Sequence, residues 1–384
     1  MKRFDVAIVG AGPAGSATAI ALARKGFSVL LLDKRIFPRE KLCGDFLNPI
    51  TLPLLENLRV MEELRLLSPR KITAFRISLA SGAQATSRFP AANGRPSFGL
   101  GLRRKDLDYT LLKRAVKLGA FLQEGYQVRA IERIKAVWSI AVEGKTTKER
   151  LEARLLIGAD GRHSRVAHRL GLARPDGDNR GSVAFQLRLA GVRGLNNEVQ
   201  IRLFPGGYAG LMALDDETAN LCFTVKPEQI QRAPSVPALM KQALWKNPSL
   251  ARALEPSEIV GEARSAYPVY FPPRHSHGEG VLLVGDAARV TEPVTGEGIF
   301  FALQSGALAA STAERAFERG DFSAEQLSAY RDACREAFAR RQRLNSIIRA
   351  LIHRPALTAV LLRLSAPTFL LRELCRDAPV WAGA

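Results

Sequence analysis

Hydrophobic and polar positions at the start of the chain follow the order strand, glycine-rich turn, helix, strand. Residues 4–9, FDVAIV, form a short apolar run of strand type, and residues 16–26, SATAIALARKG, carry apolar side chains at helical spacing up to a Gly stop. Residues 27–33, FSVLLLD, form a second buried strand that ends in Asp33. This order predicts an α/β domain with a Rossmann-type parallel sheet.

A period of two dominates two later regions, residues 72–98 and 181–273. They contain the strand patterns ITAFRISLA, SVAFQLRLAG, EVQIRLF and NLCFTV. We expect these strands to pair into a mainly antiparallel β domain that binds substrate. This domain would be inserted into the α/β domain, which then comprises residues 1–71, 99–180 and 274–323.

Residues 324–384 are expected to form a C-terminal helical segment. The apolar spacing is helical from Ala324 to Leu374 and is broken by Pro355 and Pro367. Apolar faces mixed with Arg allow two interpretations: the segment caps the α/β domain, or it lies peripherally on an anionic membrane, at its inner face.

The composition is that of a soluble globular protein. The chain has 384 residues, of which 47% are hydrophobic and 24% are charged, and this length favours two joined domains. No apolar run approaches the roughly 20 residues that cross a bilayer, and the first ten residues show no signal-peptide cleavage site. The expected location is therefore cytoplasmic.

The net charge of +19 does not by itself identify the class of partner that the protein binds. The arginines are scattered and form no aromatic-interleaved cluster or nucleic-acid motif, so no nucleic-acid partner is expected. A general bias towards Arg and an attraction to anionic membranes both remain open. The oligomeric state is not predicted.

Cysteine and histidine spacing indicates neither a disulfide framework nor a metal site. The four cysteines are far apart without a CxxC pair, and the five histidines form no metal pattern. His275 and His277 lie in the loop PPRHSHGEG and are interpreted as exposed loop residues.

The turn GAGPAG at residues 10–15 has the spacing of a dinucleotide-binding loop. Gly10 would make the tight turn, Gly12 would let a pyrophosphate approach, and Gly15 would let helix and strand pack closely. Pro13 and Ala14 lie between them, at a helix start whose N–H groups and dipole favour phosphate. Asp33, followed by Lys34, can accept hydrogen bonds from a ribose hydroxyl, which favours FAD or NAD over NADP.

Residues 281–299, VLLVGDAARVTEPVTGEGI, favour FAD over NAD. A buried strand leads to Gly285 and Asp286, then a Pro- and Gly-rich loop leads to a helix that begins near Glu297. The acid can bind a ribityl hydroxyl, and the N–H groups at the helix start can stabilise the negative charge of a reduced flavin ring.

Together with LLIGADGRHSRVAHRLG at residues 155–171, these segments resemble the three fingerprints of the p-hydroxybenzoate hydroxylase-like FAD oxidoreductases, the group A flavin monooxygenases. The resemblance covers nearly the whole chain and implies an FAD-binding domain made of the α/β segments above. It assigns Asp286 to the ribityl chain and Asp160 and Gly161 to the middle fingerprint. It also implies the following cofactor residues: Gly285, Arg104 at the phosphates or ribityl, Val128 at the adenine, and Pro293, Gly296, Gly298 and Ile299 around the isoalloxazine.

PREKLCG at residues 38–44 resembles the geranylgeranyl reductase branch, which saturates isoprenoid double bonds with reduced FAD. The resemblance places Cys43 and Gly44 beside the reacting flavin. Two features depart from the branch: Asp45 follows where a second Gly is usual, and the aromatic-x-Trp-x-Phe-Pro segment is reduced to Phe204-Pro205. The Trp-x-Trp-x-x-Pro mark of flavin halogenases is also absent from the sequence.

Aromatic and aliphatic residues of the β domain are candidates for an apolar substrate pocket, or fill the core of the sheet. They are Phe204, Tyr208, Leu211, Met212 and Phe223.

Three functions remain open from the sequence. The first is reduction of carbon-carbon double bonds in an apolar, isoprenoid- or lipid-like substrate by hydride transfer from reduced FAD. The second is hydroxylation of an aromatic or polyketide-like substrate through a flavin hydroperoxide, and the third is a non-catalytic or electron-transfer flavoprotein. The reductant would be NAD(P)H or a protein electron donor.

Overall fold

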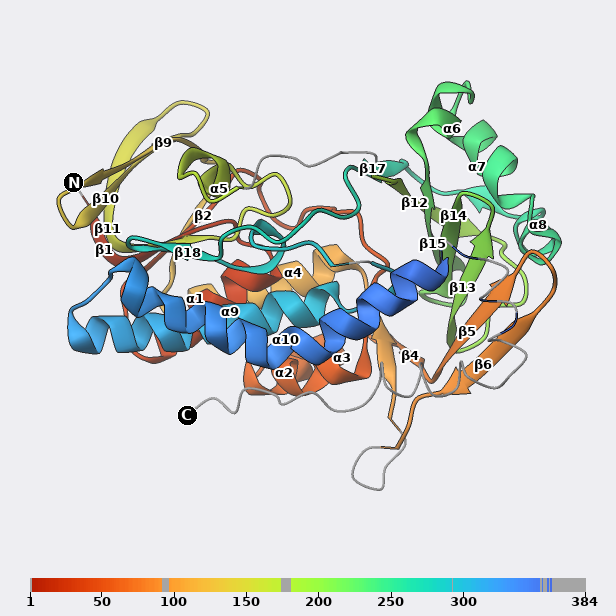
Figure 1. Cartoon of the computed structure of the whole chain (residues 1–384), viewed down its shortest axis with the longest axis horizontal. Coiled ribbons are helices and arrows are strands. Elements are labelled where there is room, and N and C mark those ends of the chain that lie inside the picture. The colour runs from red at the N-terminus through yellow and green to blue at the C-terminus, as the bar shows by residue number, and fades with distance from the viewer. Residues whose placement is uncertain are drawn as a thin grey trace.

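The computed structural model describes residues 2–91, 97–173, 181–291 and 293–352, together with 354, 358 and 360. Figure 1 shows an elongated molecule with one β-sheet towards each end and long helices running between them. The helix breaks expected at Pro355 and Pro367 lie outside the described residues.

The first sheet has five parallel strands in the order β8-β2-β1-β11-β19. Their bounds are β1 Arg3–Val9, β2 Val29–Asp33, β8 Phe121–Glu124, β11 Lys148–Gly158 and β19 Val281–Leu283. Three antiparallel strands extend it: β9 Gln127–Ile134, β10 Val137–Glu143 and β18 His277–Gly278. The buried runs of the sequence form the parallel strands because both faces of the sheet are covered, one by the long helices and the other by strands β9 and β10 and helix α5, Arg165–Arg169.

The strand order reverses between β1 and β11, where Val9 pairs with Gly158. Ligands of open α/β sheets bind beyond the carboxyl ends of the strands at such a reversal. The turn after β1 and the loop after β11 therefore form the edge at which a dinucleotide is expected.

Helices α1 Pro13–Arg24, α4 Arg104–Lys117, α9 Gly298–Arg319 and α10 Ala324–Ile352 pack together along the first sheet (Figure 1). A Cβ added to Gly306 of α9 would lie 2.7 Å from the carbonyl oxygen of Ala14, so the glycine lets α9 approach α1 closely. α5, Arg165–Arg169, follows the loop after β11. Within the described residues, no helix combines the length and the hydropathy that crossing a membrane requires.

The second sheet has the order β16-β12-β15-β14-β13-β5-β6, with β17 also paired to β12, and every pair is antiparallel except β13 with β5. Its strands are β5 Ala74–Leu79, β6 Gln84–Arg88, β12 Val183–Ala190, β13 Glu198–Phe204, β14 Gly207–Ala213, β15 Thr218–Val225, β16 Glu258–Ile259 and β17 Arg264–Ala266. Helices α6 Pro227–Gln231, α7 Val236–Leu244 and α8 Pro248–Leu254 follow β15, and α7 and α8 bury one face of this sheet.

The remaining elements are short. They are the three-stranded sheet of β3 Phe46–Leu47, β7 Gly99–Gly101 and β4 Arg70–Ile72, the helices α2 Leu52–Asn57 and α3 Met61–Arg65, and the 3-10 turns η1 Pro49–Thr51, η2 Gly285–Ala287 and η3 Pro293–Thr295. The predicted fold class is confirmed: a Rossmann-type sheet with helices, a mainly antiparallel second sheet, and a C-terminal helix α10.

Candidate active site

A cavity of about 1480 Å³, its open mouth included, lies between the two sheets. The loop after β1, the PREKLCG loop, the loops after β11 and β19, and strands β12 to β15 all contribute to its lining. Both sheets therefore contribute residues to one cavity, and the predicted cofactor and substrate residues can be compared within it.

The turn at residues 10–15 accommodates only glycine at two of its positions. Gly10 has a φ of +107°, and a Cβ there would lie 2.3 Å from the carbonyl oxygen of Ala159. A Cβ on Gly15 would lie 1.9 Å from the carbonyl oxygen of Gly10, so no side chain fits at either place. Gly12, Pro13 and Ala14 line the cavity at the start of α1, where helix N–H groups favour an anion.

Asp33 is oriented towards this turn by backbone donors. Its Oδ2 accepts the N–H of Ala11 at 2.9 Å, and its Oδ1 accepts the N–H of Arg35 at 2.9 Å. A carboxylate retains further lone pairs after these two bonds, which fits the predicted contact with a ribose. Lys34, beside it, is exposed. Arg39, which the sequence analysis missed, lies 4.0 Å from Asp33 and 3.0 Å from Asp108.

Asp286 brings the third fingerprint to the same cavity. It follows β19 in η2, and a Cβ on the neighbouring Gly285 would lie 2.9 Å from the Cβ of Ala14, so this turn packs directly on the first fingerprint. Arg162 approaches Asp286 to 4.0 Å. The lining continues with Pro293, Gly296, Gly298 and Ile299, the residues predicted to surround the flavin ring.

Lys41, a second residue that sequence reasoning missed, enters the cavity from the PREKLCG loop. Its Nζ would lie 3.3 Å from a Cβ placed on Gly161, which also lines the cavity. Burial lowers the pKa of Lys41, and the nearby Asp286 opposes that change. Its position in Pro-x-x-Lys-x-Cys-Gly was the one available signal.

Two predicted cofactor residues, Asp160 and Val128, have side chains that contact other parts of the protein. The carboxylate of Asp160 accepts bonds from the Ser164 hydroxyl at 2.5 Å and from the N–H of Arg165 at 2.7 Å, so it caps α5. Val128 on β9 is buried in the core between the first sheet and the β9–β10 hairpin. Whether either contacts the cofactor stays a prediction.

Arg104 lies at the start of α4 and lines the cavity. Its Nε and Nη2 donate to the buried Asp108 at 2.9 and 3.0 Å, and its guanidinium also contacts the Cys43 thiol. Burial alone would lower the pKa of Arg104, but Asp108 raises it above the ordinary value. The guanidinium is therefore a fixed positive charge in the cavity lining, in contact with Cys43.

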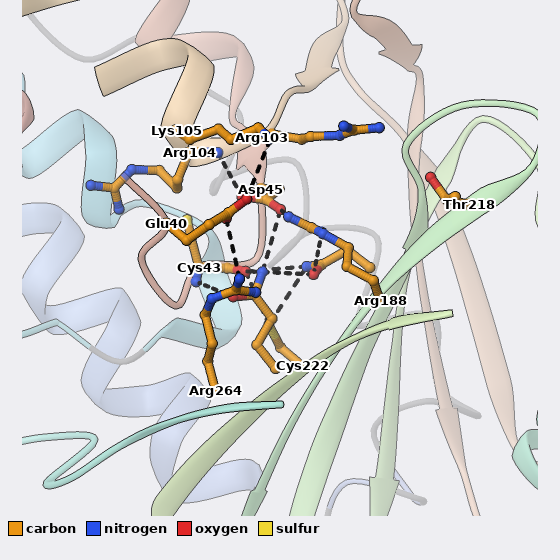
Figure 2. Close-up of polar contacts among 12 residues, drawn as sticks. Glu40, Cys43, Asp45, Arg103, Arg104, Lys105, Arg188, Thr218, Cys222 and Arg264 are labelled. Carbon is orange, nitrogen blue, oxygen red and sulfur yellow. Dashed lines mark hydrogen bonds and ion pairs between the residues drawn. The ribbon is translucent and has the colours of Figure 1, made fainter. Parts of the chain in front are cut away.

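The backbone of Cys43 is held by side chains of the second sheet (Figure 2). Its carbonyl oxygen accepts bonds from Gln186 Nε2 at 2.8 Å, Asn220 Nδ2 at 3.2 Å and the Cys222 thiol at 3.1 Å. Burial raises the pKa of the Cys43 thiol, and Arg104 opposes the rise. Cys43 and the exposed Gly44 line the cavity between the two sheets.

The substrate candidates divide between the two faces of the second sheet. Tyr208 and Met212 of β14 belong to the apolar cluster on the cavity face and line the cavity. Leu211 and Phe223 reach the lining, but their side chains belong to the cluster under α7 and α8. Phe204 packs in that helix-side cluster. Further apolar residues line the cavity and were not predicted from the sequence: Phe46, Phe75, Val199, Ile201 and Val294.

The loop before α9 is tied to α10 by a buried charge. Glu297 has no exposed surface, and its carboxylate accepts bonds from Arg341, in close contact, and from Asn345 Nδ2 at 2.8 Å. Burial raises the pKa of Glu297, and Arg341 opposes the rise. The C-terminal helix therefore fixes the glycines on either side of Glu297, both of which line the cavity.

Comparison with known proteins agrees with this geometry. The model of the FAD binding domain family matches residues 3–343. A digeranylgeranylglycerophospholipid reductase of Methanopyrus kandleri is 31% identical over 344 residues, which are 88% of this chain and 87% of that protein. Conditioned medium factor receptor 1 of Dictyostelium discoideum is 28% identical over 361 residues, 86% of this chain and 67% of that protein.

Two solved structures share the fold. A geranylgeranyl bacteriochlorophyll reductase-like protein of Thermoplasma acidophilum aligns with a TM-score of 0.79 and 22% identity, covering 98% of this chain and 93% of that one. The flavin-dependent halogenase CmlS aligns with a TM-score of 0.80 and 22% identity, covering 88% of this chain and 63% of that one.

The chain belongs to the FAD binding domain family and is an FAD-dependent oxidoreductase. Within that class it is geranylgeranyl reductase-like, as PREKLCG indicated. FAD as the cofactor is thus confirmed, and the glycine cradle, Asp33 and Asp286 suit its pyrophosphate, ribose and ribityl groups.

Proposed function

We propose that the protein reduces carbon-carbon double bonds of an apolar, isoprenoid- or lipid-like substrate. Bound, reduced FAD supplies the hydride, and the alkene takes up one proton as well, so that two C–H bonds replace the π bond. The donor that reduces FAD would be NAD(P)H or a protein electron carrier.

The observation that carries the proposal is the apolar half of the cavity. Phe75, Val199, Ile201, Tyr208 and Met212 line it, and all are buried. The cofactor half holds Lys41, Arg104 and Asp286, whereas the side chains just named carry no charge. A long hydrocarbon would be bound by dispersion and by release of water from this surface.

The protein's own residues would then have separate tasks. The turn at residues 10–15 and Asp33 would bind the adenosine and pyrophosphate of FAD, while Asp286 would bind the ribityl chain. Cys43 and Gly44 would lie beside the reacting centre, and the Cys43 thiol, kept neutral by its raised pKa, can donate a proton there, as can a water molecule.

Two incubations test the reaction, one without oxygen and one with it. The flavin is reduced without oxygen, and a prenyl lipid with several double bonds is added. Reoxidation of the flavin with a product two hydrogens heavier supports the reductase. Oxygen-dependent addition of one oxygen to a phenolic substrate instead would establish hydroxylation, and no response to either substrate would favour a non-catalytic or electron-transfer flavoprotein.

We also propose a peripheral membrane contact through the C-terminal helix. α10 exposes Ile347, and Arg343 is exposed one turn earlier, a pairing of apolar and cationic side chains that favours an anionic interface. Sedimentation with phosphatidylglycerol vesicles tests it. Binding should fall at high salt and with Arg343→Glu, and equal binding to neutral phosphatidylcholine vesicles would contradict it.

A further inference from the structure

A buried polar network connects the PREKLCG loop to the second sheet (Figure 2). At its centre, Asp45 has only 1% of its surface exposed. Its Oδ1 accepts the backbone N–H of Arg104 at 2.9 Å, and its Oδ2 accepts a close bond from Arg188 of β12. This carboxylate therefore joins α4 and the second sheet through one loop residue.

Gln186, two residues before Arg188 on the same face of β12, has no exposed surface. Its Oε1 accepts the N–H of Cys43 at 3.3 Å, while its Nε2 donates to the Cys43 carbonyl oxygen at 2.8 Å. One side-chain amide thus pairs with both backbone groups of Cys43, as a neighbouring strand would. Asn220 accepts bonds from Gln186 at 2.8 Å and from Arg188 at 2.6 Å, so the amide clamp and the ion pair share a partner.

The backbone of Asp45 suits glycine better than any other residue. Its φ is +53°, in the left-handed region that glycine adopts without cost. An aspartate there is explained by its carboxylate, which pairs with Arg188, whose side chain is only 14% exposed. If either partner is removed, the charge of the other stays buried, with little water around it and without its ion-pair partner, which destabilises the folded loop.

We propose that Asp45 and Arg188 are positioning residues, an ion-pair latch that holds Cys43 and Gly44 in one place between the cofactor half and the apolar half of the cavity. The latch acts on Cys43 through Gln186 and Asn220, without touching the cavity itself. Its effect on turnover rests on the proposed function, but its effect on the loop does not.

The test follows Cys43 directly in FAD-loaded protein without substrate. The rate of Cys43 alkylation by iodoacetamide is measured by peptide mass spectrometry at one fixed pH, with the visible circular dichroism of bound FAD recorded in parallel. Asp45→Asn, Asp45→Gly and Arg188→Gln should each raise the rate about tenfold and change the flavin signal, because the loop is released. The double variant Asp45→Asn/Arg188→Gln should react no more than about threefold faster than the faster single variant, because either single substitution already breaks the latch.

Glu40 offers a matched control on the same loop. It forms looser ion pairs with Lys105 at 3.5 Å and Arg264 at 3.9 Å, at 36% exposure, so Glu40→Gln should leave the alkylation rate unchanged. Single variants that react at the parental rate, or a double variant whose rate increase approaches the product of the two single increases, would overturn the latch. If one single variant fails to retain FAD, the alkylation rates of the remaining single variants decide by comparison with the parent.

Failure of the latch and failure of the proposed reaction give different results. An inactive protein with normal latch behaviour leaves the latch standing and argues against alkene reduction. If the reaction is found, latch variants should lower kcat more than they raise KM for the lipid, because the apolar half of the cavity is intact.

Discussion

Loss of Arg341 should destabilise the protein in a way that depends on pH. Arg341 is 6% exposed on α10 and its guanidinium bonds Glu297, which is fully buried before α9. Arg341→Met keeps the length and apolar stem of the side chain but removes the charge. The carboxylate of Glu297 then retains Asn345 but loses its ion pair.

The size of the effect follows from burial. Breaking a buried ion pair by removing one partner costs about 3–5 kcal/mol, because the remaining charge is left with neither water nor a counter-charge. The guanidinium also lies 5.2 Å from the ring centre of Phe300, a contact worth about 0.5–2 kcal/mol that Met replaces only in part. We therefore expect a loss of about 4 kcal/mol at pH values where Glu297 is ionised.

The sign of the pH dependence is fixed by the direction of the pKa shift. Burial already raises the pKa of Glu297, and without Arg341 the rise is larger. Between the ordinary glutamate value and the raised one, the folded state binds a proton that the unfolded state does not, so stability falls as the pH rises through this window. The variant should lose more at about pH 8 than at about pH 5 relative to the parent.

Urea unfolding followed by far-ultraviolet circular dichroism measures this loss at both pH values. Arg343→Met, an exposed change on the same helix, is the control and should cost less than about 0.5 kcal/mol. Glu297→Gln/Arg341→Met should recover most of the loss because no charge remains buried. The reasoning is refuted if Arg341→Met costs no more than Arg343→Met, or if its cost grows towards acidic pH.

Three further predictions concern the cavity. Gly15→Ala should abolish FAD binding, seen as a colourless purified protein, since its Cβ would lie 1.9 Å from a backbone oxygen; retained yellow colour would argue against the cradle. Asp286→Ala should weaken FAD binding by about 10- to 100-fold in a fluorescence titration. Asp33→Ala, measured in parallel, gives the corresponding loss at the ribose of the adenosine. An unchanged Kd for Asp286→Ala would show that Asp286 does not bind the cofactor. Val199→Trp should fill the apolar half of the cavity and abolish lipid-dependent flavin reoxidation while FAD stays bound. Val199→Ala should retain this reoxidation. Activity in both variants would show that the substrate binds elsewhere.

The first sheet and the cofactor cradle could be predicted from the sequence because their determinants are local. The turn at residues 10–15 and Asp33 lie within one strand, helix, strand unit, so their spacing alone carries the signal. Gln186 and Cys43 are 143 residues apart, and nothing in the alternating pattern of β12 marks Gln186 as a partner of that loop. Only the folded chain brings the two together.

The substrate candidates show a second limit of sequence analysis. Alternation predicts that neighbouring side chains face opposite sides of a strand, but it does not say which side meets the cavity. That choice depends on α7 and α8, which cover one face of the second sheet. In the sequence, Phe204 and Tyr208 look equivalent, because both are aromatic residues in predicted strands. In the structure Phe204 faces the helices, whereas Tyr208 faces the cavity.

The two faces of the second sheet also affect how this protein can change over evolutionary time. On β14 the cavity face carries Tyr208 and Met212, while the intervening Ala209 and Leu211 are buried with α7 and α8. A mutation in the first set resizes the space for a hydrocarbon, and one in the second set erodes the core. Substrate range can therefore drift through single substitutions at alternate positions while the hydrophobic support behind them stays constant, which makes the cavity face the natural place to engineer chain-length preference.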